Sequence, residues 1–154
     1  MPVRKIATNT RASHMRVGIV AARFNPGVGE KLLAGALRAL EYASVAHDAI
    51  TIASVPGALE VPLALQRMAQ TGDYDALVAL GAVIRGETYH FEIVANESAS
   101  GVASVQLEFG TPIGNGILTT DTEAQANDRA DAKGHDAALA AIEMANLLDA
   151  IDEE

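Results

Sequence analysis

The chain has 154 residues, a length typical of one domain, and 49% of them are hydrophobic. Its formal net charge of -9, from 11 basic and 20 acidic side chains, argues against general nucleic-acid binding, which requires a basic face. The absence of cysteine excludes disulfides, thiolate catalysis and cysteine-based metal sites, and is typical of a cytoplasmic protein.

The N-terminal segment MPVRKIATNTRASH carries positive charge but lacks the apolar run and cleavage site of a secretion signal. No stretch approaches the roughly 20 apolar residues of a membrane helix, so we expect a soluble protein that does not contact membranes. We predict a tail over residues 1–15 and a single domain over residues 16–154.

The domain begins with an apolar strand, residues 16–22, which is continuous enough to be covered on both faces as in parallel sheets. A turn with Gly and Pro leads to an amphipathic helix over residues 30–45. A second strand is predicted at residues 49–55. The helix that follows, residues 61–70, tolerates Pro62 only in its first turn.

A third strand at residues 75–84 precedes a helix over about 91–107. The fourth strand is predicted at residues 112–118, and two helices follow it at 122–130 and 135–151. This alternation predicts right-handed crossovers and an α/β fold of the flavodoxin-like kind, a three-layer sandwich with a four-stranded parallel sheet. Ligands bind such folds beyond the carboxyl ends of the strands. The turns to compare are therefore residues 23–25, 56–60, 85–90 and 119–121.

Gly86, Glu87 and Thr88 stand just before a predicted helix, where backbone N–H groups and the helix dipole favour a phosphate group. Ordinary capping of the helix by Thr88 explains the same residues, and the spacing alone favours capping by roughly two to one. No Walker-type or GxGxxG pattern is present, which argues against nucleotide triphosphates and dinucleotides.

His90 is the only histidine in a predicted strand-to-helix turn, and an imidazole there can transfer protons at neutral pH. A helix-end histidine without a chemical role is an equally good interpretation. The four histidines lack HxxxH or HExxH spacing, so we predict no metal site.

Two further turn residues have both a functional and an ordinary interpretation. Glu60 can accept hydrogen bonds from ligand hydroxyls, or can be a favourable carboxylate near a helix N-terminus. Phe24 lies in a turn, where its ring can stack on a flat ligand or cover the end of the sheet. Arg129 and Lys133, by spacing alone, are solvated helix residues.

Five segments taken together are similar to the 6,7-dimethyl-8-ribityllumazine synthase family: RFN (23–25), VPGALEVP (55–62), GAVIRGETYHFE (81–92), GILTTDTEAQANDRA (116–130) and AIEMAN (141–146). The likeness extends in collinear order from about Arg16 to Leu148. It implies that the chain condenses 5-amino-6-(D-ribitylamino)uracil with 3,4-dihydroxy-2-butanone 4-phosphate, releasing phosphate and water, in riboflavin biosynthesis. It also implies that no cofactor and no metal are needed.

The resemblance also implies roles for individual residues. Phe24 would stack on the pyrimidine ring, and His90 would transfer protons. The remaining contacts to the pyrimidine substrate and its ribityl chain would come from Asn25, Ala58, Leu59, Glu60 and the backbone of Val83 and Ile84. The phosphate would be held by Gly86, Glu87, Thr88 and Arg129. No role follows for Arg85.

The family likeness implies a homopentamer in which Arg129 reaches the site of a neighbouring subunit. Such pentamers stand alone or form a hollow shell of twelve, and the sequence does not choose between them; riboflavin synthase is a candidate partner. Asn115 stands where many members carry an aromatic residue for the ring pocket. Residues 133–141 are shorter than the loop of many relatives, so Lys133 is a candidate substitute for a lysine of that loop.

A different class of protein, a flavin- or lumazine-binding shell without catalysis, would share the fold. The set of Phe24, Glu60, His90 and Arg129 favours the enzyme, because a pure scaffold does not need it. A receiver-type signalling domain fits poorly, because the first strand ends in Arg-Phe-Asn and not in paired acids.

Overall fold

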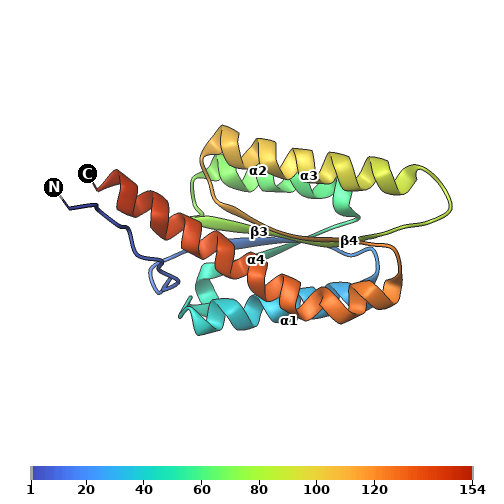
Figure 1. The fold of residues 1–154 in the computed structure, drawn as a ribbon, viewed down its shortest axis with the longest axis horizontal. Helices are drawn as coiled ribbons and strands as arrows, with labels where there is room; N and C mark the ends of the chain where they lie inside the picture. The colour runs from blue at the N-terminus through green and yellow to red at the C-terminus, as the bar shows by residue number, and fades with distance from the viewer. Residues whose placement is uncertain (1, 154) are drawn as a thin grey trace.

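Four parallel strands form a sheet in the middle of the structure, a computed structural model that describes residues 2–153 (Figure 1). The strands lie side by side in the order β2-β1-β3-β4. Their bounds are Val17–Ala22 for β1, Ile50–Val55 for β2, Ala76–Ile84 for β3 and Ile113–Thr120 for β4. The predicted α/β fold with a four-stranded parallel sheet is confirmed.

Helices cover both faces of this sheet and give three layers (Figure 1). One face carries α1 (Pro26–Tyr42) and α4 (Glu123–Asp152), and the other carries α2 (Val61–Thr71) and α3 (His90–Phe109). Short 3-10 helices, η1 and η2, occupy His47–Ala49 and Ala58–Glu60. Within residues 2–153, no helix is long and apolar enough to cross a lipid bilayer.

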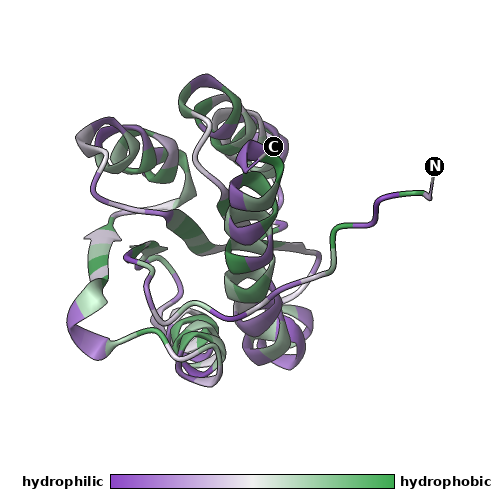
Figure 2. Ribbon diagram, turned by 90° about the vertical axis from the view of Figure 1, so that its left-hand side faces the viewer, coloured by the Kyte–Doolittle hydropathy of each residue, from purple (hydrophilic) through white to green (hydrophobic). Residues whose placement is uncertain are grey.

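The sheet divides the apolar core into two parts, one under each pair of helices. β3 lies inside the sheet and is buried along almost its whole length, as its uninterrupted apolar sequence predicts. β2 is an edge strand and exposes Thr51, Ile52 and Ser54. The helices show both green hydrophobic and purple hydrophilic stretches, as helices with one face on a core do (Figure 2).

The first helix begins at Pro26, earlier than the predicted start at Glu30. Proline is tolerated there because the first N–H group of a helix has no intrahelical acceptor. Asn25, just before it, adopts the left-handed conformation with φ of 62°, which Asn accepts more readily than most residues. The chain therefore turns from β1 into α1 within three residues, Arg23 to Asn25.

The last helix, α4, is a single helix of 30 residues, so the two helices predicted at 122–130 and 135–151 were wrong as separate elements. Gly134, which lies between the two predicted helices, is buried against α1, where a Cβ atom would collide with the carbonyl oxygen of Leu32. A glycine inside a helix costs about 1 kcal/mol relative to alanine, and close packing of the two helices offsets it. The loop expected after Lys133 is helical for the same reason.

The second half of the expected N-terminal tail, residues 9–15, contacts the protein core and α4. Residues 2–8 are exposed, whereas Ala12 and Met15 are buried. The side-chain amide of Asn146 donates hydrogen bonds to the carbonyl oxygens of Asn9 and Arg11, at 2.8 and 2.9 Å. These bonds fasten the segment before β1 to the last helix.

Candidate functional site

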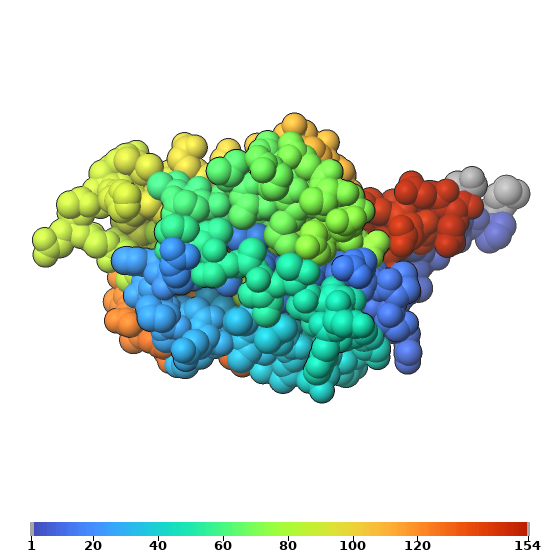
Figure 3. Space-filling view, turned by 180° about the vertical axis from the view of Figure 1, so that it is seen from behind, coloured from blue at the N-terminus to red at the C-terminus, as the bar shows by residue number. Residues whose placement is uncertain are grey.

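A cavity of about 500 Å³ opens at the carboxyl ends of β1, β2 and β3. We call it the strand-end cavity. These strand ends lie at the end of the molecule opposite the C-terminus (Figure 1), where the space-filling view shows the yellow-green segment before α3 far from the red end of α4 (Figure 3). Parallel strands bring their carboxyl ends to one edge of the sheet, which is why turns far apart in sequence meet here. Its lining residues are Phe24, Pro56, Gly57, Ala58, Leu59, Glu60, Ala82, Val83, Ile84, Gly86, Thr88, His90, Phe91 and Val94.

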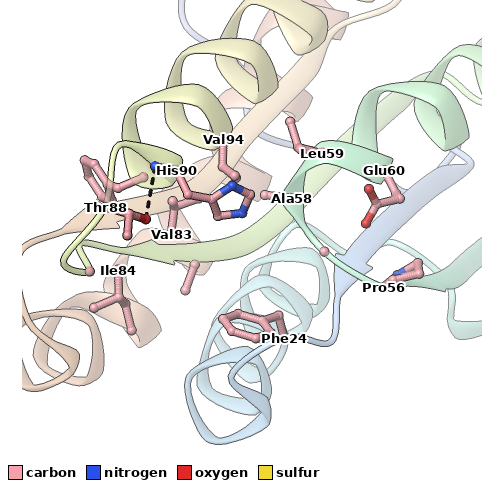
Figure 4. Close-up of a pocket in the computed structure, with 14 residues that line it drawn as sticks. Phe24, Pro56, Ala58, Leu59, Glu60, Val83, Ile84, Thr88, His90 and Val94 are labelled. Carbon is pink, nitrogen blue, oxygen red and sulfur yellow. Dashed lines mark hydrogen bonds between the residues drawn. The ribbon is translucent and has the colours of Figure 1, made fainter.

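Phe24 lies at the rim of the strand-end cavity, and 68% of the residue is exposed (Figure 4). The N–H group of Arg23 donates to the carbonyl oxygen of Val55 at 2.9 Å, which ties the end of β1 to the end of β2. An aromatic ring exposed to water on a turn costs hydrophobic free energy, and a flat ligand stacked on the ring recovers it.

The turn after β2 supplies Ala58, Leu59 and Glu60 from the short helix η2. Ala58 is buried and anchors this turn, whereas Leu59 and Glu60 are exposed. The Glu60 carboxylate folds back over Gly57, where a Cβ atom would lie 3.2 Å from its Oε1. The turn therefore presents a carboxylate to the cavity, close to a backbone that has no side chain to cover it (Figure 4).

The end of β3 offers backbone groups to the strand-end cavity. Among residues 2–153, the pairing of β3 with β1 stops at Leu80, whereas its pairing with β4 continues to Ile84. Val83 and Ile84 therefore have a neighbouring strand on one side only. Their backbone polar groups on the side of β1 need partners, and a ligand in the cavity can provide them.

His90 is the first residue of α3, and its imidazole ring points into the strand-end cavity (Figure 4). Thr88 accepts a long hydrogen bond of 3.4 Å from the His90 N–H group, and α3 has no side-chain cap on its N-cap residue, Tyr89. Within residues 2–153, the N–H groups of Gly86, Glu87 and Thr88 have no hydrogen-bond acceptor. Capping by Thr88 is thus present but weak, and it leaves donors for an anion.

A second, separate hollow of about 330 Å³ contains Arg129 and Lys133. We call it the α4 hollow; it is lined by Ile117, Leu118, Thr119, Thr120, Asp121, Gln125, Arg129 and Lys133. Arg129 Nη1 donates to the carbonyl oxygen of Gln125 at 3.0 Å, one turn back along α4. Within one chain the structure therefore does not bring these two cations to His90.

Three other candidates lie outside the strand-end cavity. Asn25 and Glu87 are on turns at its edge but do not line it. Asn115 is exposed on β4, and its side-chain oxygen accepts from the N–H group of Ile117 at 3.1 Å. Thr119 and Thr120, predicted as a turn, belong to β4, and Thr120 Oγ1 donates to the Thr122 carbonyl oxygen at 2.8 Å.

Sequence reasoning missed Phe91 and Val94, which line the cavity beside His90, and gave no role to Arg85. Val94 lies four residues after His90 and so on the same helix face, a signal that was present in the sequence. Arg85 Nη1 contacts Glu92 Oε1 at 2.6 Å, and Arg85 Nε contacts Asp121 Oδ1 at 2.9 Å. The hydrogen bond from Arg85 holds the pKa of Glu92 below its ordinary value.

Metal ligands are not grouped in the described part of the chain. Over residues 2–153, no set of three or more His, Asp or Glu side chains is placed to hold a metal ion. The strand-end cavity offers the imidazole of His90, the carboxylate of Glu60, the hydroxyl of Thr88, the exposed ring of Phe24 and the backbone at the end of β3.

Comparison with known proteins identifies the family. The sequence profile of the 6,7-dimethyl-8-ribityllumazine synthases matches residues 14–149. A 6,7-dimethyl-8-ribityllumazine synthase of Ralstonia nicotianae is 57% identical over 145 residues, which cover 94% of this chain and 88% of that protein. The enzyme of the same name from Neisseria meningitidis is 50% identical over 149 residues, 97% of this chain and 94% of that protein. The chain therefore belongs to the 6,7-dimethyl-8-ribityllumazine synthase family.

Proposed function

We propose that the strand-end cavity is the site at which this chain carries out the reaction of its family. That reaction condenses 5-amino-6-(D-ribitylamino)uracil with 3,4-dihydroxy-2-butanone 4-phosphate to 6,7-dimethyl-8-ribityllumazine, releasing phosphate and water, in riboflavin biosynthesis. The observation that carries the proposal is the convergence of Phe24, Glu60 and His90 on one cavity from three successive strand ends.

The pyrimidine substrate binds along the end of the sheet. Its flat ring stacks on Phe24, and its polar edge pairs with the backbone of Val83 and Ile84, which has no β1 neighbour at this point. Glu60 accepts hydrogen bonds from the ribityl hydroxyls, helped by the turn backbone at Ala58 and Leu59. Asn25 contacts the substrate from the edge of the cavity, and Asn115, which lies on β4 outside it, contributes to the ring pocket of a neighbouring subunit.

The phosphate group of the second substrate binds at the start of α3. The N–H groups of Gly86, Glu87 and Thr88 point to no acceptor within residues 2–153, and the positive end of a helix of 20 residues lies beside them. Arg129, with Lys133 beside it in the α4 hollow, reaches this phosphate from a neighbouring subunit. The separation of the two hollows within one chain supports that assignment.

His90 carries protons between the reacting groups. The substrate's amine attacks the ketone, water is lost as the imine forms, phosphate leaves, and the ribitylamino nitrogen closes the ring with loss of water. No nucleophile of the protein is needed, so holding the two reactants together supplies much of the acceleration, with effective molarities of ~10⁵ M or more in well-oriented cases. General acid–base catalysis by His90 adds a factor of about 10² to 10⁴.

We propose a homopentamer, the assembly that the family likeness implies, standing alone or as one of twelve in a hollow shell. That Arg129 and Lys133 lie outside the strand-end cavity of their own chain supports a site shared between subunits. Riboflavin synthase, which consumes the product, is a candidate partner, and the cytoplasm is the expected location. Light scattering on the purified protein distinguishes a pentamer from a shell.

The test of function mixes the purified protein with both substrates and follows lumazine absorbance together with phosphate release. We expect both signals in step. A folded oligomer that binds the pyrimidine substrate but produces neither signal would contradict the proposal and favour a binding shell without catalysis.

The test of roles compares His90→Ala with Arg129→Ala. His90→Ala should lower kcat by about 10² with a small change in KM, because it removes proton transfer. Arg129→Ala should mainly raise KM for the phosphate-bearing substrate. His47→Ala, an exposed histidine of η1 outside both hollows, is the matched control and should leave both parameters unchanged. Equal, small effects of the two site variants would refute these roles.

A further inference from the structure

Arg85 stands between the strand-end cavity and the α4 hollow, and its side chain joins three separate elements. We propose that it is a positioning residue: it clasps the segment 86–91, which carries the phosphate-binding backbone and His90, and keeps Asp121 from pairing with the cations of the α4 hollow. The proposal deepens the assigned function and rests on it for its kinetic part.

Each part of the guanidinium has its own partner. Nη1 contacts Glu92 Oε1 in the first turn of α3 at 2.6 Å, and Nε contacts Asp121 Oδ1 in the β4–α4 turn at 2.9 Å. The central carbon lies 4.4 Å from the centre of the Phe91 ring, a cation–π contact. Only a planar fork of donors on one side chain can make these three contacts together.

The first consequence concerns the segment 86–91. Arg85 and Glu92 flank it, so their ion pair links the two ends of the segment. We call this ion pair the clasp. Within the segment, Thr88 accepts the long bond from the His90 N–H group, and the Tyr89 carbonyl oxygen accepts from the N–H groups of Glu92 and Ile93 at 3.1 and 3.4 Å, at the start of α3. Just before the segment, the Arg85 N–H group donates to the Thr120 carbonyl oxygen at 2.9 Å. Residues 86–90 are all exposed, and a Cβ on Gly86 would meet nothing within 4 Å. Packing therefore does little to fix the backbone of residues 86–90, which raises the importance of the clasp, whereas Phe91 packs against the core.

The second consequence concerns charge. Asp121 lines the α4 hollow together with Arg129 and Lys133. Its backbone N–H group donates to Gln125 Oε1 at 2.8 Å, and the Gln125 carbonyl oxygen accepts from Arg129. Asp121 and Arg129 thus line the same hollow, and both contact Gln125. The ion pair with Arg85 occupies the Asp121 carboxylate and leaves Arg129 available for the substrate.

A second arginine–carboxylate ion pair serves as a control that separates a positioning role in the site from a role in folding stability. Arg38 on α1 makes two hydrogen bonds to Asp131 on α4, away from both hollows, and its side chain is 53% exposed against 49% for Arg85. Exposed ion pairs contribute little to folding stability. Loss of either arginine should therefore change stability equally little, whereas only Arg85 should change the site.

The experiment compares Arg85→Gln with Arg38→Gln and the wild-type protein, all as intact oligomers. We expect Arg85→Gln to lower kcat/KM for the phosphate-bearing substrate by about 30- to 100-fold, since a displacement of ~1 Å at a reacting group can cost 10²-fold. Arg38→Gln should lower it less than about 2-fold, with thermal midpoints of the two variants alike. Arg85→Lys should recover only part of the loss, because lysine lacks the fork.

Two further measurements isolate the two consequences. Amide hydrogen exchange should become faster in residues 86–91 of Arg85→Gln and not of Arg38→Gln, and this readout needs no substrate. Adding Asp121→Asn to Arg85→Gln should lower KM for the phosphate-bearing substrate again, by removing the competing carboxylate.

The proposal is overturned if Arg85→Gln and Arg38→Gln have equal kcat/KM, or if the loss in Arg85→Gln follows a lower thermal midpoint. Unchanged hydrogen exchange in residues 86–91 would overturn the clasp. If the wild-type protein itself shows no turnover, the assigned function fails, and the exchange experiment still decides whether the clasp exists.

Discussion

The two helical layers of this protein are packed in opposite ways. On one face, α1 and α4 approach so closely that glycine is required at Gly35 and Gly134, where any Cβ atom would collide with the backbone of the other helix. On the other face, α2 and α3 leave large apolar side chains in solvent: Leu63 is 65% exposed and Leu107 is 83% exposed. The first layer is thus joined by direct contact between helix backbones, although Tyr42 on α1 is also 78% exposed, whereas both helices of the second layer expose large apolar side chains.

The starts of α3 and α4 also differ, in how far side chains satisfy the first N–H groups of each helix. α4 begins with a capping box: Gln125 N donates to Thr122 Oγ1 at 3.1 Å, and Thr122 N donates to Gln125 Oε1 at 3.2 Å. α3 has no side-chain cap at its N-cap residue, Tyr89. A helix start that satisfies its own N–H groups has no use for an anion, and one that does not can bind phosphate. The layer of α2 and α3 is thus also the layer that carries the proposed phosphate site.

The largest expected effect tests whether the layer of α2 and α3 has an apolar core of its own. Leu65 on α2 is fully buried, and Leu65→Ala should lower the free energy of unfolding by about 3 kcal/mol through lost burial and the cavity left behind. Urea unfolding at a fixed protomer concentration measures it. A loss under about 1 kcal/mol would mean that α2 contributes little to folding.

Gly134→Ala tests the close contact between α1 and α4. Alanine favours a helix by about 1 kcal/mol over glycine, but overpacking costs about 1 to 3 kcal/mol or more, and here the colliding atom is backbone that cannot rotate away. We expect a net loss of about 2 kcal/mol in the same assay. Gly27→Ala, on α1 where a Cβ meets nothing within 4 Å, is the matched control and should be neutral or stabilising. Equal results for both would contradict the close packing.

Thr122→Ala should lower the free energy of unfolding by about 1 kcal/mol, because it removes the side-chain acceptor of the capping box. Thr88→Ala removes only a long bond at the start of α3, so its effect on unfolding should be smaller. Reversal of this order would show that α3 is capped as firmly as α4, and would weaken the case for a phosphate site there.

Leu63→Ala should change the unfolding of a single chain by less than about 0.5 kcal/mol, because its side chain is mostly exposed. If α2 and α3 face another subunit, the charged variant Leu63→Glu should instead shift the particle to smaller sizes in light scattering. An unchanged particle size with Leu63→Glu would place the subunit contact elsewhere.

The smallest effect concerns pH. Hydrogen bonds from Arg85 and Arg38 lower the pKa of Glu92 and of Asp131 respectively. A lowered carboxyl pKa adds stability that is present above the ordinary value and is lost as the pH falls through the lowered one. Carboxyl NMR titrations should find both midpoints below their ordinary range. Arg85→Gln should raise only that of Glu92, and Arg38→Gln only that of Asp131; a common response would contradict independent pairs.

Local sequence determined most of the fold. Apolar runs and turn residues predicted the four strands, and helical spacing predicted most of the helices, with boundaries displaced by a few residues. The error at α4 has a clear cause, since Gly134 reads locally as a break and only the position of Leu32 on α1 shows that it is a contact. A glycine required by a distant backbone looks the same in sequence as a glycine that ends a helix.

The candidate site divides in the same way. Because parallel strands end at one edge, the sequence could place Phe24, Glu60 and His90 together without knowing any distance. It could not show that β3 continues beyond Leu80, the last of its residues that pairs with β1, since strand register is set by packing of the whole sheet. Nor could it show that Arg129 lies in a separate hollow from His90 of the same chain.

Arg85 marks the limit of sequence reasoning here. The sequence by itself determined the order of strands and helices and which turns share an edge, because apolar periodicity and backbone preferences act over a few residues. Tertiary structure alone decided that Arg85 meets Glu92, Phe91 and Asp121. Asp121 lies 36 residues away along the chain. Such a contact depends on the paths of two helices and a strand, and no local pattern encodes it.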